Sequence, residues 1–167
     1  MWRRILFTGC LWAAIVAVPS DAETQVLLGF VDSDTRFAVQ GAVDGAAARL
    51  GHPACQEVFA DFADDSGQDL RPRLLAKGKS AVEAFATLRV VDSRPAPQCR
   101  TGTTLAFTTI RSTVIHVCGA PFMKRSLRNR MAAEIILIHE FLHTLGLGEN
   151  PPTSDAITAQ VMLRCGG

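Results

Sequence analysis

The chain has 167 residues, of which 48% are hydrophobic and 20% are charged. This is the composition of an ordinary globular protein, and it argues against a fibrous repeat or a largely disordered chain. A single domain with a buried core is expected for this length. The formal net charge of +1 gives no indication of a nucleic acid or an anionic membrane as a partner.

The N-terminal segment has the pattern of a cleaved signal peptide. Two arginines are followed by an apolar run over residues 5–18 and by small residues up to Ala22. The apolar run is shorter than the roughly 20 residues that a membrane span needs. We therefore expect residues 1–22 to be removed and residues 23–167 to form the domain. The protein would be secreted or periplasmic, without stable membrane association.

The cysteines of the expected mature chain are Cys55, Cys99, Cys118 and Cys165. An even number of cysteines in an exported protein predicts two disulfide bonds, for which three pairings are possible. A zinc site made of four cysteines needs closely spaced pairs, whereas these residues are far apart along the chain. The sequence therefore favours disulfide bonds and leaves their pairing open.

A short strand and a helix are expected first. Residues 26–31 form an apolar run that is typical of a strand. Small and apolar side chains over residues 35–50 predict a helix, which Gly41 and Gly45 weaken. Residues 57–63 mix apolar and acidic side chains, and we expect a further strand there.

Three segments rich in β-branched residues predict the rest of a small sheet. They are residues 87–91, 104–109 and 113–118, and turn residues separate them. The last two segments are expected to form a hairpin that turns at residues 111–112.

A long helix follows, which should begin between residues 121 and 127 and end near Leu145. From residue 132 onward this segment is apolar on nearly every side, as is typical of a helix buried inside a domain. Two histidines and a glutamate lie in its middle. They need partners, because burying unpaired polar groups is costly.

These three polar residues have the spacing H-E-x-x-H, from His139 through Glu140 to His143. Residues four apart on a helix lie on one face, so both imidazole rings can bind a single metal ion. Zinc is the expected ion, because tetrahedral coordination by histidine is typical of it. Glu140 is offset from the metal and can accept the proton of a zinc-bound water molecule instead.

A catalytic zinc ion has a third protein ligand and keeps its fourth position open for water. Gly146 can adopt the left-handed conformation that ends a helix and turns the chain sharply. Glu149, three positions later, can then return to the metal. Asp155 is the remaining acidic alternative, although its place in the first turn of a later helix is also explained by the helix dipole.

This segment resembles the extended zinc-binding signature of the metzincin metallopeptidases, H-E-x-x-H-x-x-G-x-x-H, in which aspartate sometimes stands last. His139, Glu140, His143 and Gly146 fall on their places in the signature, and Glu149 occupies the place of the third ligand. The resemblance implies that His139, His143 and Glu149 bind one catalytic zinc ion. It also implies that Glu140 is the general base.

The metzincins carry a methionine turn beneath the metal, for which Met162 would be the candidate here. We expect Met162 instead to be a packing residue of a short C-terminal helix. Ser154 is the expected N-cap of that helix, and Ile157 and Val161 lie one turn apart behind it.

The expected architecture is a single α+β domain of the zincin type. It would combine a small mixed sheet, a backing helix, the buried active-site helix and the short C-terminal helix. In zincins the edge strand before the active-site helix pairs with an extended substrate, and residues 113–118 are the expected equivalent. His116, on the same strand, is a candidate for a side chain that faces the cleft, although a lone histidine on a strand more often has a structural role.

The expected function is that of a secreted zinc metallopeptidase, which hydrolyses a peptide or protein substrate with Glu140 as the general base. The alternative is an exported binding or structural module in which the zinc ion only stabilises the fold. Such a site would be closed by a fourth protein ligand, with His116 and Asp155 as candidates. Glu140 favours the enzyme, because a structural site has no use for a carboxylate at that offset.

Overall fold

A computed structural model describes residues 26–30, 32–76 and 80–167 of the chain. The expected signal peptide lies outside these ranges. Within them, no helix is long and apolar enough to cross a membrane. In chain order the elements are β1 (Leu27–Gly29), α1 (Ser33–Leu50), α2 (Pro53–Gln56), α3 (Val58–Asp61), α4 (Leu70–Ala76), α5 (Ala81–Ala86), β2 (Arg89–Asp92), the 3₁₀ helix η1 (Pro97–Thr101), β3 (Ala106–Thr108), β4 (Val114–Val117), α6 (Gly119–Arg128), α7 (Arg130–Thr144) and α8 (Ser154–Cys165).

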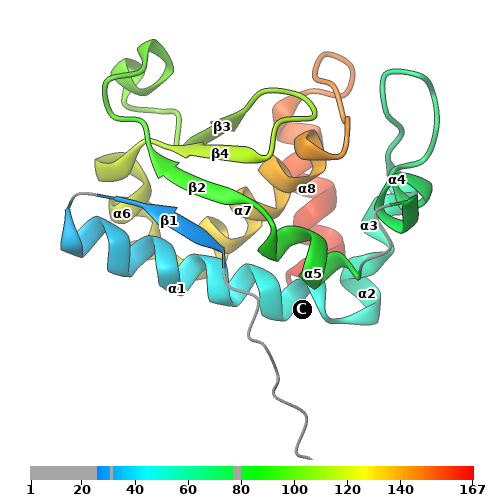
Figure 1. Cartoon of the computed structure of the whole chain (residues 1–167), viewed down its shortest axis with the longest axis horizontal. Helices are drawn as coiled ribbons and strands as arrows, with labels where there is room; N and C mark the ends of the chain where they lie inside the picture. The colour runs from blue at the N-terminus through cyan, green and yellow to red at the C-terminus, as the bar shows by residue number, and fades with distance from the viewer. Residues whose placement is uncertain (1–25, 31, 77–79) are drawn as a thin grey trace, which may run out of the picture.

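The strands form a four-stranded mixed sheet in the order β1-β2-β4-β3 (Figure 1). The pairs β1–β2 and β2–β4 are parallel, whereas β3 is antiparallel to β4 and lies at the edge. The mixed sheet and the hairpin of β3 and β4 are confirmed. The edge position expected for residues 113–118 is wrong, because β4 already has a hydrogen-bonded neighbour on each side.

Two long helices, α1 and α7, pack together beneath the strands (Figure 1). Side chains alternate between the two faces of a strand. In β4, Ile115 and Val117 are therefore fully buried, while His116 between them is only partly buried. α1 is the predicted backing helix, α7 contains the predicted buried helix, and α8 is the predicted C-terminal helix. The N-cap expected for α8 at Ser154 is wrong, because the side chain of Thr153 accepts the hydrogen bond from the backbone N–H of Ala156 at 3.2 Å. The chain is thus confirmed as a mixed α and β domain.

A buried carboxylate joins α1 to α7. Glu134 of α7 accepts a hydrogen bond from Arg49 of α1 at 2.7 Å and another from Arg130 at 3.2 Å. Its carboxylate lies against Gly45, where an added Cβ atom would collide with it. The glycine that weakens α1 in terms of helix propensity therefore leaves the space that this contact needs.

The predicted long helix is divided into α6 and α7. Between them Asn129 has an extended backbone, with φ −154° and ψ 92°. Its side chain accepts a hydrogen bond from the backbone N–H of Ala132 at 3.0 Å and so caps α7. The sequence predicts a continuous helix with the basic residues of this stretch as its solvated start, whereas the break depends on the cap that one side chain forms.

The strand predicted for residues 57–63 is wrong, because the segment forms the single helical turn α3. Its first two residues are both buried, which does not fit a strand with one exposed face. Asp61, at its end, accepts hydrogen bonds from Arg164 of α8 at 2.7 Å. Contacts with α8 therefore shape this segment more than its own residue pattern does.

Two disulfide bonds connect distant parts of the chain. Cys55 of α2 pairs with Cys165 at the end of α8, over a sequence separation of 110 residues. Cys99 of η1 pairs with Cys118 at the start of α6, over 19 residues. The prediction of two disulfide bonds is confirmed, and the structure selects one of the three possible pairings.

Candidate metal centre

The two histidines of the motif lie one turn apart in the middle of α7. His139 is 3% exposed and His143 is 5% exposed, and their Nε2 atoms are 3.0 Å apart. Both nitrogens therefore meet at one place, as the spacing on the helix predicts.

Directly after α7 the chain turns back toward these rings. Gly146 has a φ of 114°, a conformation that residues with a side chain rarely adopt. Its N–H donates to the carbonyl oxygen of His143 at 3.0 Å. After this turn, Glu149 Oε1 lies 3.5 Å from His139 Nε2 and 3.6 Å from His143 Nε2. The structure thus brings Glu149 to the position expected for the third ligand.

A hydrogen bond on the far side of each ring fixes its orientation. His143 Nδ1 lies 2.8 Å from the carbonyl oxygen of Leu147. Because a carbonyl only accepts, Nδ1 is the donor, and in the neutral ring this leaves the lone pair on Nε2. His139 Nδ1 lies 2.9 Å from the hydroxyl oxygen of Thr158 in α8, which can accept a hydrogen bond in the same way.

The environment also keeps His139 uncharged. Burial and the neighbouring His143 lower the pKa of His139 to about 4, against the opposing effect of Glu149. At neutral pH the ring is therefore neutral, which is the form that binds a metal ion.

A buried aspartate anchors the turn that carries Glu149. Asp64 pairs with Leu147 in an isolated antiparallel bridge. Its carboxylate accepts a hydrogen bond from the Ser66 hydroxyl at 2.6 Å and one from Arg73 at 2.7 Å. The Ser66 hydroxyl is the largest influence holding the pKa of Asp64 well below its usual range, while burial acts in the opposite direction. Asp64 is therefore charged and fixed beside the turn.

The turn between β3 and β4 provides a second anchor. Arg111, whose φ is 64°, donates its backbone N–H to the carbonyl oxygen of His143 at 2.9 Å. Its guanidinium group forms an ion pair with Asp65. The β3–β4 turn, the end of α7 and the segment before α4 are thus linked around the site.

Glu140 is a buried carboxyl group next to the candidate metal ligands. It is 6% exposed, and within the described ranges its Oε2 atom has no hydrogen-bond partner. Burial raises the pKa of Glu140 to about 7, the nearby Thr108 lowers it, and the charge of Glu149 raises it further. A carboxyl group with a pKa near neutrality can both accept and release a proton at physiological pH.

The site opens into a cavity of about 700 Å³. Glu140, His143 and Glu149 line it together with Ser154 at the start of α8 and all of β3. β3, and not β4, is therefore the strand that borders the site.

Two other predicted candidates do not reach the site. His116 is paired with Ser93, with 2.7 Å between His116 Nδ1 and Ser93 Oγ, and its ring stacks on Phe107. It does not line the cavity, so its candidate place facing the cleft is not found, and its contacts fit the structural role that is more common for a lone histidine on a strand. The reason is the strand alternation that buries its neighbours Ile115 and Val117 toward the helices. Asp155 is exposed in the first turn of α8 and does not belong to the ligand group.

The donor atoms of His139, His143 and Glu149 all lie within 4.8 Å of one another. Among the described residues, this is the one group of three or more side chains that can hold a metal ion. Two imidazoles and one carboxylate form a donor set typical of catalytic zinc. The residues present therefore fit the ion that the sequence predicts.

The residues that hold the candidate ligands in place were not predicted from the sequence. Thr158 lies next to the buried residues Ile157 and Val161 of the predicted C-terminal helix. A polar side chain next to a buried helix face can contact another buried polar group, and this signal could have identified Thr158. Asp64 and the carbonyl group of Leu147 carry no local signal, because their roles depend on contacts between segments far apart in the sequence.

Comparison with protein-family models, with curated proteins and with solved structures gives no match for this chain.

Proposed function

We propose that this protein is an exported zinc metallopeptidase of the zincin type. The observation that carries the proposal is the grouping of two buried histidines and Glu149 beside the buried carboxyl of Glu140. Three protein ligands leave one position of a tetrahedral ion open. A zinc ion bound there would supply a Lewis acid for water and for the carbonyl group of a substrate.

In this proposal Glu140 is the general base. It accepts a proton from the attacking water molecule and later donates this proton to the departing amine. Its pKa of about 7 in the metal-free protein and its unpartnered oxygen support this role. Thr158 and the Leu147 carbonyl keep the two imidazole rings oriented while the proton moves.

The substrate would bind as an extended strand along β3. Among the described strands β3 has β4 as its one hydrogen-bonded neighbour, so its other edge offers backbone groups to a peptide. The cavity that contains Glu140 follows this strand. β3 thus takes the role that resemblance to the zincins assigns to residues 113–118.

A purely structural zinc site is less well supported, because such a site needs a fourth protein ligand. Neither His116 nor Asp155 belongs to the ligand group. Export is supported by the two disulfide bonds, which persist in oxidising compartments.

Metal analysis and peptide digestion test this proposal together. The mature protein should contain one zinc ion per chain, and His143→Ala should lose it. The zinc-loaded protein should cleave members of an unbiased peptide library, and a chelator should stop the cleavage. Unchanged zinc content in the variant, or no cleavage of any peptide by the zinc-loaded wild type, would contradict the proposal.

A further inference from the structure

The cavity at the ligands is followed by a second hollow along α7 and α8. Glu140 and Ser154 line the first cavity, while Ile136 and Thr158, each one helical turn away, line the second. One turn advances about 5.4 Å along a helix. Leu105, which precedes the first residue of β3, also lines the second hollow. Both hollows therefore follow the same three elements away from the ligands.

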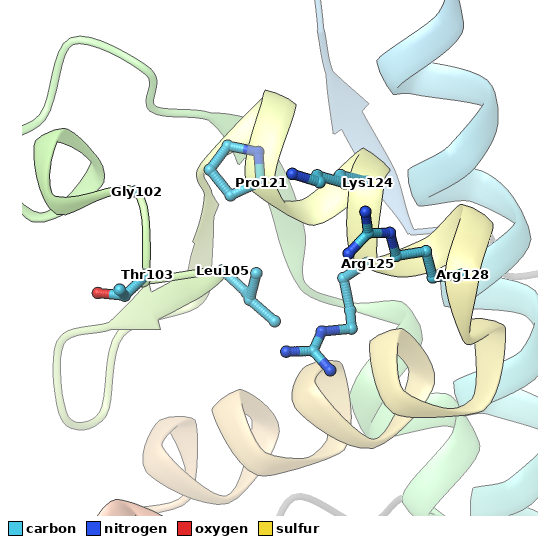
Figure 2. A pocket seen from close by; sticks show the side chains of 7 residues that line it. All are labelled: Gly102, Thr103, Leu105, Pro121, Lys124, Arg125 and Arg128. Carbon is cyan, nitrogen blue, oxygen red and sulfur yellow. The ribbon is translucent and has the colours of Figure 1, made fainter.

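A third hollow, with a volume of about 400 Å³, lies at the end of this path. It shares Leu105 and Arg125 with the second hollow. Figure 2 shows that Lys124, Arg125 and Arg128 extend from α6 on the side that faces the segment of Thr103 and Leu105. The path from the metal ligands therefore ends at three positive charges.

These charges differ from most arginines of the described chain, which form ion pairs with carboxylates. The paired residues are Arg49, Arg71, Arg73, Arg94, Arg111, Arg130 and Arg164. Lys124, Arg125 and Arg128 are exposed and have no acidic partner among the described residues. Neighbouring like charges repel, and a guanidinium group binds a carboxylate through two parallel hydrogen bonds. The hollow is thus suited to an acidic group supplied from outside.

We propose that the basic pocket formed by Lys124, Arg125 and Arg128 binds a carboxylate of the peptide substrate. This inference rests on the proposed peptidase function and adds a substrate class to it. Along α7 the first two hollows extend from Glu140 to Asn129, which lines the second hollow together with Arg125. These eleven positions correspond to about 16 Å of helix, which an extended peptide spans with about five residues. The substrate would therefore carry an acidic side chain, or its own C-terminal carboxylate, about five residues from the bond that is cleaved.

Direct binding tests the pocket without requiring hydrolysis. The protein is the zinc-loaded Glu140→Gln variant, and the probes are labelled ten-residue peptides. One peptide has three glutamates at its C-terminal end, the second has glutamines there, and each is made with a free and an amidated C-terminus. By fluorescence anisotropy the acidic peptide with a free C-terminus should bind about tenfold more tightly than the amidated glutamine peptide, and this preference should shrink in high salt.

Two pairs of substitutions that remove the same charge show whether the preference for the acidic peptide arises in the pocket. Adding Arg125→Gln and Arg128→Gln should remove the preference, whereas adding Arg36→Gln and Arg89→Gln, two exposed arginines outside the pocket, should leave it intact. Loss of preference on amidation identifies a terminal carboxylate, and loss on exchange of glutamate for glutamine identifies side chains. Equal binding of all four peptides, or a preference for the acidic peptide that survives in the Arg125 and Arg128 variant, would overturn the proposal that the pocket binds a carboxylate. Digestion by the wild type tests the peptidase separately, because acidic peptides can bind to the pocket even if none is cleaved.

Discussion

The two imidazole rings of the site are positioned by residues outside the group of candidate metal ligands. Leu147 offers a backbone carbonyl to His143, so that contact does not depend on the identity of a side chain. Thr158 offers a hydroxyl to His139, so this contact can be removed by substitution. Groups behind a metal ligand fix the tautomer and the direction of the ring, and their loss commonly weakens metal binding.

Thr158→Val keeps the shape of the side chain and removes the hydroxyl. We expect its zinc affinity, measured by competition with a chelator, to fall about 10–100-fold. Thr144→Val is the matched control, because the Thr144 hydroxyl donates to the carbonyl oxygen of Phe141 at 2.7 Å. Equal zinc affinity in the two variants would show that Thr158 does not orient His139.

At the scale of elements, the site depends on the short segment between α7 and α8. This segment turns at Gly146 and is held by the backbone bridge between Leu147 and Asp64. The carboxylate of Asp64 is in turn bound by Ser66 and Arg73. The position of Glu149 therefore depends on the charged carboxylate of Asp64, which lies in the first half of the chain.

The low pKa of Asp64 predicts how stability changes with pH. Its pKa is lower in the folded protein than in the unfolded chain, so the unfolded chain binds more protons as the solution becomes acidic. The contribution of Asp64 is therefore present above its unfolded pKa of about 3.9 and is lost as the pH falls below that value. Asp64→Asn should lower the free energy of unfolding near neutral pH, and its difference from the wild type should shrink below pH of about 4.

Urea unfolding at a series of pH values measures this difference. Asp69→Asn is the control, since Asp69 is exposed in the same segment. A constant difference between Asp64→Asn and the wild type from neutral to strongly acidic pH would contradict the assignment.

Elements that a local pattern specifies were predicted well from the sequence. The buried face of α7, the hairpin of β3 and β4 and the histidine pair all follow from spacing along one segment. The break at Asn129 and the turn of α3 were missed, because one depends on a single cap and the other on contacts with α8. The strand that borders the site was also missed, since the order of strands in a sheet depends on contacts between distant segments.

For the whole molecule, the disulfide between Cys55 and Cys165 holds the C-terminal helix to the first half of the chain. α8 carries Thr158 and borders the cavity at Ser154. Fixing α8 therefore also fixes one wall of the site.

The two disulfides should contribute unequally to stability. In the chain-entropy description a loop of about 100 residues gives roughly 4.7 kcal/mol, and one of about 15 residues gives roughly 3 kcal/mol. Replacing Cys55 and Cys165 by alanine, which opens the loop of 110 residues, should therefore destabilise the protein more than replacing Cys99 and Cys118, which opens a loop of 19. Urea unfolding of the two double variants decides this, and an equal or reversed ranking would show that native packing around the bridges outweighs loop length.

The central claim is that a buried carboxyl group beside three zinc ligands acts as a general base, and Glu140→Gln tests it most directly. The substitution keeps the volume of the side chain and removes the group that accepts a proton. The variant should fold and retain its zinc ion, and its rate of peptide hydrolysis should fall by at least the roughly 10²–10⁴-fold typical of general acid–base catalysis. A zinc-loaded variant that hydrolyses peptides as fast as the wild type would contradict the account.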